Sequence, residues 1–227
     1  MVFGGLQKLT LLDFPGTVSC ILFTKGCNFA CPFCHNAALV KSDNLPEYTE
    51  DEIFDFLKKR KGILDGVCIT GGEPLIHPSL PDFIRKVRAI GYKVKLDTNG
   101  AFPERLKELM DENLLDYVAM DIKNTFSKYP ETSGCENVNI SDIEKSIDLL
   151  LYSNVPYEFR TTVTKELHTT EDIAFIANRI KGAQKYFLQN FTDSGDILKE
   201  GMHSVDNPTL EKMVCKAQYF VPAAKFR

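Results

Sequence analysis

Long hydrophobic runs are missing from this sequence. No segment approaches the roughly 20 consecutive apolar residues that a membrane-spanning helix needs, and Asp13 interrupts the only apolar run near the start of the chain. That start also lacks the basic stretch followed by an apolar core that is typical of an export signal. We therefore expect a soluble, cytoplasmic protein that has no membrane partner.

An excess of basic residues is also missing. The chain has 27 Lys and Arg against 31 Asp and Glu, a net charge of −4, so its composition gives no sign of a surface that binds nucleic acid. No internal repeat, low-complexity tract or linker interrupts the sequence. With 227 residues, 44% of them apolar, the chain is long enough to bury a substantial core. We expect a single domain over residues 1–227.

Seven cysteines are present, and disulfides are not expected among them. In a reducing compartment, clustered cysteines bind metal or take part in catalysis more often than they pair. Cys20 and Cys68 lie in apolar runs and are expected in the core as small hydrophobic residues. Cys135 and Cys215 lie in an expected loop and helix, and we assign neither of them a catalytic role.

The other three cysteines lie within eight residues of one another. The segment KGCNFACPFCHN contains Cys27, Cys31 and Cys34, and no fourth cysteine follows nearby. A structural zinc site needs four protein ligands and a catalytic one three plus water. The only close fourth candidate is His35, which directly follows Cys34 and is therefore awkward as a ligand. A [4Fe–4S] cluster fits better, because thiolates bind iron well and a C-x3-C-x2-C loop can wrap three corners of a cube. The vacant corner predicts that a small molecule coordinates the fourth iron.

Short β-branched segments alternate with longer amphipathic ones along the chain. Thr49 and Thr170 each precede acidic residues, which is typical of a capped first helical turn. The alternation predicts an α/β fold of βαβ units with a parallel sheet. Six units are too few for a closed eight-fold barrel, so we expect an open, partial (β/α)6 TIM-like barrel with ligands at the carboxyl ends of the strands. The expected strands are residues 17–24, 66–70, 92–97, 116–121, 156–163 and 184–190, and the expected helices are residues 49–61, 79–90, 103–113, 141–152, 170–181 and 207–220.

Polar groups end the second and third expected strands. The second ends in ITGGEPL, where the pair Gly71 and Gly72 lets the backbone approach a ligand closely and Glu73 supplies an acceptor. The third ends in LDTNG, where Asp97 and Asn99 can take ribose hydroxyls, as an acidic residue does in dinucleotide folds.

The fourth and fifth expected strands also end in charged groups. The fourth ends in MDIKN, and the carboxylate of Asp121 with the ammonium of Lys123 suits the zwitterionic head of an amino acid. The fifth contains FRTT, where Arg160 can pair with a carboxylate through two hydrogen bonds. Each group alone could be an ordinary salt bridge. Five successive strand ends with such groups, on the side where parallel βα folds build sites, favour a binding site.

These motifs together resemble the radical S-adenosylmethionine (radical SAM) superfamily, in which C-x3-C-x2-C follows the first strand. The segments GLQKLTLLDFPG, CNFACPFCHN, GGEPL, LDTNG, MDIKN and RTTV are most similar to the glycyl-radical-enzyme activases, and among these to the activases of anaerobic ribonucleoside-triphosphate reductase. Pyruvate formate-lyase activating enzymes are near relatives. The resemblance covers Gly5 to about Asp196.

The resemblance implies a radical SAM fold, a [4Fe–4S] cluster on the three clustered cysteines and S-adenosylmethionine on the fourth iron. Gly71, Gly72 and Glu73 form the element that holds the amino group of this cofactor. Where the formate-lyase relatives have a histidine at the last strand end, this chain reads FLQNF, so Gln189, Asn190 or Phe191 is the candidate to cover the adenine. The implied contacts are Phe33 for the adenine, Asp97 and Asn99 for the ribose, and Asp121, Lys123 and Arg160 with Gly72 and Glu73 for the methionine.

The resemblance also implies the reaction. A flavodoxin or ferredoxin type reductant supplies one electron, S-adenosylmethionine is cleaved to methionine and a 5′-deoxyadenosyl radical, and this radical takes the α-hydrogen of a glycine in a glycyl radical enzyme. The implied partner is the large subunit of anaerobic ribonucleotide reductase. The segment between the clustered cysteines and Gly71 has no cysteine-rich insert, so accessory clusters are not expected.

Other functions stay open at this point. A radical SAM enzyme could act on a pyruvate formate-lyase type enzyme, on a peptide or on a small molecule. A protein of another class, a zinc-stabilised or simple electron-transfer module without turnover, could also contain the three clustered cysteines. We assign no catalytic role to the four histidines, His35, His77, His168 and His203, because proton transfer is not the difficult step of the implied reaction.

Overall fold

The computed structural model describes residues 1–41, 45–193, 195 and 197–227. Its backbone divides into two compact units. Unit 1 comprises Met1–Asn28, Ala38–Thr98 and Glu104–Val118, and unit 2 comprises Phe29–Ala37, Asn99–Pro103 and Ala119–Arg227. The single domain expected over residues 1–227 stays a prediction. Asp196, near which the resemblance ends, lies outside the described residues.

The strands of unit 1 follow the order β3–β1–β2–β4–β5. β2, β4 and β5 are parallel, with Cys68 of β4 opposite Ile21 of β2 and Lys95 of β5. β1 runs antiparallel to β2 and to β3. No strand was expected at β1, because its two glycines and mixed polarity hide the alternation of a strand. Its structure is decided by the pairing with β2 and β3. The bounds are β1 (Val2–Thr10), β2 (Ser19–Thr24), β3 (Tyr48–Thr49), β4 (Gly66–Gly71) and β5 (Lys93–Thr98).

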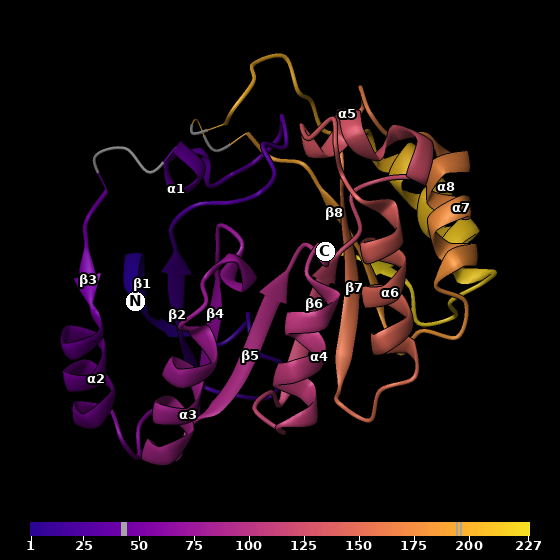
Figure 1. Cartoon of the computed structure of the whole chain (residues 1–227). Coiled ribbons are helices and arrows are strands. Elements are labelled where there is room, and N and C mark those ends of the chain that lie inside the picture. Colours follow the sequence, from indigo (N-terminus) through magenta and orange to yellow (C-terminus); the bar gives the residue numbers. More distant parts are fainter. Residues whose placement is uncertain (42–44, 194, 196) are drawn as a thin grey trace. The chain divides into compact units, whose positions relative to one another are not determined.

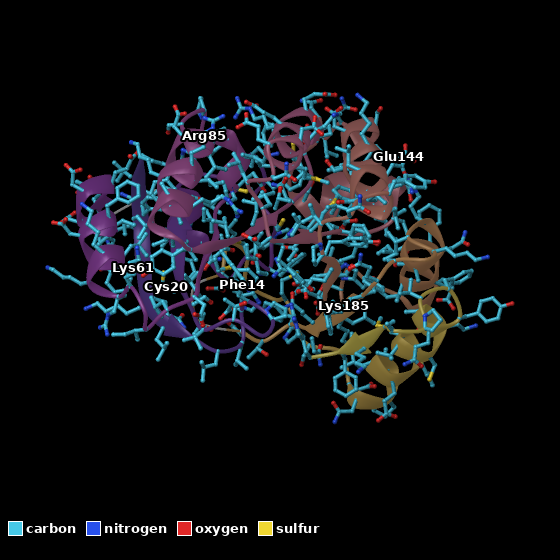
Figure 2. All side chains as sticks on the ribbon, turned by 90° about the horizontal axis from the view of Figure 1, so that it is seen from below. Phe14, Cys20, Lys61, Arg85, Glu144 and Lys185 are labelled. Atoms are coloured by element: carbon cyan, nitrogen blue, oxygen red, sulfur yellow. The ribbon has the colours of Figure 1, made fainter. Side chains whose placement is uncertain are left out.

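The helices of unit 1 cover an apolar face of these strands. Cys20, Val67 and Leu96 are fully buried on that face, and Figure 2 shows Cys20 and the buried Phe14 among the side chains of unit 1, with Lys61 and Arg85 exposed. The core placement expected for Cys20 and Cys68 is confirmed. The bounds are α1 (Ala37–Lys41), which begins in unit 2, α2 (Glu50–Lys59), the 3₁₀ turn η1 (Pro74–Ile76), α3 (Leu80–Ile90) and α4 (Pro103–Asp111).

The strands of unit 2 follow the order β6–β7–β8–β9, and β7, β8 and β9 are parallel. Helices α7 and α8 pack side by side (Figure 1). No described helix of either unit is long and apolar enough to cross a membrane. The bounds are β6 (Tyr117–Asp121), which begins in unit 1, η2 (Phe126–Lys128), α5 (Tyr129–Ser133), α6 (Ile140–Leu151), β7 (Tyr157–Val163), α7 (Thr170–Arg179), β8 (Tyr186–Asn190), α8 (Asn207–Gln218) and β9 (Lys225–Phe226).

The six expected strands and six expected helices all form, each within two residues of its expected ends. Thr49 caps α2 as expected. Its hydroxyl accepts a hydrogen bond from the Glu52 amide, and the Glu52 carboxylate accepts one from the Thr49 amide. The cap expected at Thr170 is wrong by one residue. Thr169 caps α7 instead. Its hydroxyl accepts a hydrogen bond from the Asp172 amide, and the Asp172 carboxylate accepts one from the Thr169 amide at 2.8 Å.

The Asp172 carboxylate of this cap also accepts a hydrogen bond from Lys128 at 2.6 Å. Burial by itself raises the pKa of Asp172, but the hydrogen bonds from Lys128 and Thr169 outweigh it and hold the pKa below its usual value. A depressed pKa in the folded state contributes stability that is present above the unfolded pKa, about 3.9 for Asp, and is lost as the pH falls through the folded value.

Asp172→Asn is therefore expected to lower the free energy of unfolding by about 1–2 kcal/mol at pH 7, because the cap and the ion pair are both weakened. Below about pH 4 the difference from the unmodified protein should shrink as the unfolded carboxylate becomes protonated, and it should vanish as the pH falls through the lower folded pKa. Chemical denaturation at several pH values measures both effects. Glu171→Gln, an exposed change in the same helical turn, is the control, and a difference for Asp172→Asn that does not vary with pH would contradict this account.

Candidate functional site

The cysteine loop is shared between the units: Cys27 lies in unit 1, and Cys31 and Cys34 lie in unit 2. The unit 2 part is held by backbone hydrogen bonds. The Cys34 amide donates to the Cys31 carbonyl at 3.0 Å, which forms a turn between the two thiols. On either side of Cys31, the Ala30 amide donates to Ser133 at 2.9 Å and the Pro32 carbonyl accepts the Lys199 amide at 3.0 Å. The loop backbone is therefore fixed by segments far from it in the sequence.

Burial sets the charge state of Cys31. Its side chain is 7% exposed, and burial raises the pKa of its thiol to about 11, against a lowering influence of the Lys123 ammonium. The charges of Cys34 and Asp121 raise the same pKa further. The metal-free thiol is accordingly protonated at neutral pH. Because metals bind the thiolate, metal binding at Cys31 must displace this proton.

In unit 1 the GGE turn after β4 is packed against the start of the cysteine loop. The Gly26 carbonyl accepts the Glu73 amide at 2.9 Å, and the Gly72 amide donates to Thr24 at 2.9 Å. A Cβ on Gly72 would lie 1.8 Å from the Gly26 oxygen. Gly71 has φ +107°, which an L side chain adopts with strain. The backbone at both positions therefore requires glycine, independently of any ligand that binds there.

Glu73 is 1% exposed, and its carboxylate has partners within unit 1. One oxygen accepts the Thr98 hydroxyl at 2.8 Å and the Leu75 amide at 3.1 Å, so the side chain caps η1. A ligand amino group would join these contacts rather than meet an isolated carboxylate. Its role toward S-adenosylmethionine stays a prediction.

His77 is a residue of this region that the sequence did not single out. Its Nε2 lies 2.9 Å from the carbonyl oxygen of Lys25, two residues before Cys27. Burial lowers the pKa of His77, which favours the neutral ring. The loop start is thus held by His77 as well as by the GGE turn. Only the tertiary contact reveals this, because His77 follows η1 and lies far from Lys25 in the sequence.

Asp97, expected at the ribose, belongs to a buried polar group in unit 1. Its carboxylate is paired with the ammonium of Lys95, which is 1% exposed and also lies 3.6 Å from the sulfur of Cys68. Lys95 and Asp97 share one face of β5 because side chains two apart on a strand point the same way. Asn99, in unit 2, is buried and accepts the Ala101 amide at 3.0 Å. The sequence analysis missed Lys95, although its spacing from Asp97 was a signal.

Asp121, Lys123 and Arg160 are brought together in unit 2, as the strand-end pattern predicted. The Asp121 carboxylate accepts Lys123 Nζ at 3.1 Å and Arg160 Nε at 2.7 Å. Burial alone would raise the pKa of Asp121, but the two cations hold it well below its usual range. Burial would likewise lower the pKa of Lys123, yet the Asp121 charge raises it. All three groups are ionised, and their sum of +1 suits a ligand carboxylate.

The residues expected near the adenine all lie in unit 2. Phe33 is buried, and its ring centroid lies 6.2 Å from that of His168 in an edge-on arrangement. Gln189 is half-buried at the carboxyl end of β8, opposite Thr162 of β7.

Two further candidates for the adenine have structural partners. The side chain of Asn190 donates to the Val205 carbonyl at 2.9 Å and accepts the Val205 amide at 3.0 Å, so it fixes the chain after β8. The Phe191 ring lies 5.3 Å from that of His35. Which of these residues meets the adenine stays a prediction. Among the described residues, no three His, Cys, Asp or Glu side chains converge on a site for a single metal ion.

Residues 21–180 match the profile of the radical SAM superfamily. This chain belongs to the radical SAM superfamily. A Methanocaldococcus jannaschii protein named as a glycyl-radical enzyme activating enzyme is 37% identical over 195 residues, which cover 82% of this chain and 78% of the relative. Pyruvate formate-lyase-activating enzyme of Listeria monocytogenes is 32% identical over 130 residues, which cover 52% of this chain and 51% of that enzyme. This radical SAM chain therefore belongs to the glycyl-radical enzyme activating enzymes.

Solved structures confirm the fold of this radical SAM chain. A domain of pyruvate-formate lyase-activating enzyme from Bacteroides vulgatus superposes with a TM-score of 0.59 at 20% identity and covers 71% of this chain and 98% of that domain. Streptococcus suis SuiB, in complex with its precursor peptide, gives a TM-score of 0.71 at 15% identity over 91% of this chain and 48% of SuiB. The expected α/β fold with a partial barrel is confirmed.

Radical SAM enzymes use a [4Fe–4S] cluster and S-adenosylmethionine, and these are the cofactors of this chain. The described residues fit both. Three thiols in C-x3-C-x2-C are the donors that such clusters take. In unit 2 the hydroxyl of Tyr129 is buried beside the backbone of Lys123; burial raises the pKa of Tyr129, while the charge of Lys123 lowers it. The excess cation of the Asp121, Lys123 and Arg160 group fits the carboxylate of S-adenosylmethionine.

Gly72→Ala is expected to disrupt the start of the cysteine loop, because the new Cβ would collide with the Gly26 oxygen, a backbone atom that cannot rotate away. The anaerobically reconstituted variant should lose most of its iron and fall in melting temperature by several degrees. Gly62→Ala is the control: its Cβ meets nothing within 4 Å, so only the strain of positive φ, about 1–2 kcal/mol, applies. Full iron content in Gly72→Ala would contradict the close approach.

Lys95→Met is expected to lower the free energy of unfolding by about 3–5 kcal/mol, because it leaves the buried Asp97 charge without its cation. The double variant Lys95→Met with Asp97→Asn should recover part of this loss, and a double-mutant cycle from chemical denaturation measures the coupling. Lys93→Met, exposed on the same strand, should stay within about 0.5 kcal/mol of the unmodified protein. Additive single effects would show that the pair is not coupled.

Proposed function

We propose that this chain activates anaerobic ribonucleoside-triphosphate reductase by abstracting the α-hydrogen of a glycine in its large subunit. The observation that carries the activase part is the 37% identity, over most of both chains, to a relative named for this activity. The choice of the reductase rests on the resemblance of the motifs from GLQKLTLLDFPG to RTTV. A single radical SAM domain over residues 1–227 is part of the proposal.

Each part of the proposed site has one task. Cys27, Cys31 and Cys34 hold the cluster through three irons. When bound, the cluster supplies an electron to the sulfonium of S-adenosylmethionine, whose carbon–sulfur bond then breaks. Lys123 and Arg160, already assembled around Asp121, hold the methionine carboxylate and fix the orientation of the sulfonium.

The nucleoside contacts complete this proposed site. Glu73 and the backbone of Gly71 and Gly72 take the methionine amino group. Asp97 and Asn99 take the ribose, and Phe33 and Gln189 lie at the adenine. Of these residues, Glu73, Asn99 and Phe33 are buried.

The reductant in the proposal is a flavodoxin or ferredoxin type protein, because the cluster must receive one electron for each cleavage. No disulfide links the described cysteines, which suits a reducing, cytoplasmic location. A second partner class, pyruvate formate-lyase, is favoured by the names of relatives from Listeria and Staphylococcus aureus. These relatives match over about half to three fifths of their length.

Co-incubation under anaerobic conditions tests the function. The reconstituted chain, S-adenosylmethionine and a reductant are mixed either with anaerobic ribonucleotide reductase or with pyruvate formate-lyase. We expect a glycyl radical doublet in the paramagnetic resonance spectrum with the reductase, and 5′-deoxyadenosine formed with it. A doublet with pyruvate formate-lyase alone would assign the second partner class.

Two variants control this experiment. Cys31→Ala should lose the cluster and form neither radical nor 5′-deoxyadenosine, because two thiols are too few to hold the cube. Cys215→Ala, at an exposed position of α8, should behave as the unmodified chain. Undiminished iron in Cys31→Ala, or no radical in either partner despite cleavage, would contradict the proposal.

A further inference from the structure

His168 is buried in unit 2, with 4% of its surface exposed, and each ring nitrogen has one backbone partner. The Thr164 amide donates to Nδ1 at 3.1 Å, so Nδ1 has no proton. Nε2 then has the proton and donates it to the Lys123 carbonyl oxygen at 2.8 Å. The imidazole is therefore held as one neutral tautomer in one orientation.

The charged groups around His168 agree with this neutral form. Burial lowers the pKa of His168, and the nearby ammonium of Lys128 lowers it too, while the charge of Asp172 and the two backbone contacts raise it. Together these influences lower the pKa of His168. Lys128 and Asp172 are moreover paired with each other at 2.6 Å, so neither acts on the ring as an isolated charge.

His168 links two parts of unit 2 that are far apart in the sequence. Through its hydrogen bond it holds the main chain of Lys123, whose ammonium pairs with Asp121 at 3.1 Å. Through its ring it packs edge-on against Phe33, which lies between Cys31 and Cys34.

A second buried link supports the same junction. The Asn124 side chain donates to the Leu167 carbonyl at 2.9 Å, which ties the residue after Lys123 to the residue before His168. Two adjacent residues of one loop thus bond two adjacent residues of the other. A loop fixed at both points can hold a charged side chain without reorganising when a ligand arrives.

We propose that His168 is a positioning residue for S-adenosylmethionine, because its imidazole fixes the Lys123 main chain and the Phe33 ring and so sets where the methionine carboxylate binds relative to Cys31 and Cys34. This inference rests on the proposed assignment of Lys123 to the methionine head. Both ring nitrogens of His168 are engaged by backbone groups, so we assign it a positioning rather than a catalytic role. The proposed effect depends on the hydrogen bond from Nε2 to the Lys123 carbonyl oxygen.

Two conservative variants separate this role from packing. His168→Gln places an amide nitrogen near the position of Nε2 and can still donate to Lys123. His168→Asn places its amide near Nδ1 and can bond only toward Thr164. Because Asn is one methylene shorter than Gln, a purely structural residue would lower the melting temperature and the affinity in parallel, whereas a positioning residue lowers the affinity at a matched melting temperature.

Equilibrium dialysis of S-adenosylmethionine against the reconstituted chain measures the effect, with iron content and melting temperature recorded in parallel. We expect His168→Asn to weaken binding about tenfold, which corresponds to about 1.4 kcal/mol, at unchanged iron content. His168→Gln should stay within about threefold of the unmodified chain. His203→Gln, an exposed histidine paired with Glu166, should not change the affinity.

The outcomes separate this inference from the proposed site. Equal affinity in His168→Asn and His168→Gln overturns the positioning role. Lys123→Met is the reference: if it binds S-adenosylmethionine as well as the unmodified chain, the methionine site itself is wrong. If Lys123→Met binds weakly while His168→Asn binds normally, the site stands and only the role of His168 falls. None of these measurements depends on the partner enzyme.

Discussion

The close approach of the Gly26 carbonyl to the GGE turn is the constraint on which the unit 1 half of the candidate site depends. That oxygen accepts the Glu73 amide and leaves no space for a Cβ at Gly72. Because Gly26 directly precedes Cys27, the turn after β4 determines where the first cysteine ligand begins. The same turn directs Glu73 inward to Thr98 at the end of β5. Three consecutive strand ends are thus joined by backbone and buried side-chain contacts.

In unit 2 the candidate site is built on a cluster of paired charges. Asp121 is shared by Lys123 and Arg160, so the three charges are assembled before any ligand binds. Removing such groups from water is costly unless they are paired, and the excess cation offers an anionic ligand a partner that is already desolvated. A preassembled site loses less free energy to ordering when the ligand binds. His168 and Asn124 connect the loop after β6 to the loop after β7 by hydrogen bonds.

The buried polar groups follow one arrangement in both units. Lys95 with Asp97, and Lys123 with Asp121, are each separated by two residues along the chain. In each pair the side chains lie toward the carboxyl end of a parallel strand, where ligands bind in βα folds. A radical SAM enzyme must keep its cofactor dry and oriented, and paired charges provide orientation at a lower desolvation cost than isolated ones. The same pairs make these strand ends sensitive to single substitutions.

The sequence by itself determined the parallel strands, the six amphipathic helices, the cysteine loop and the strand-end motifs, because hydrophobic period, helix capping and ligand spacing are local properties of the chain. It also predicted that Asp121, Lys123 and Arg160 would meet, since parallel strands place their carboxyl ends at one edge. Only the tertiary structure decided the pairing of β1 with β2, the partners of Glu73 and Lys95, and the roles of His77 and His168. Each of these depends on contacts between residues far apart in the sequence, and burial and hydrogen-bond partners arise from such contacts alone.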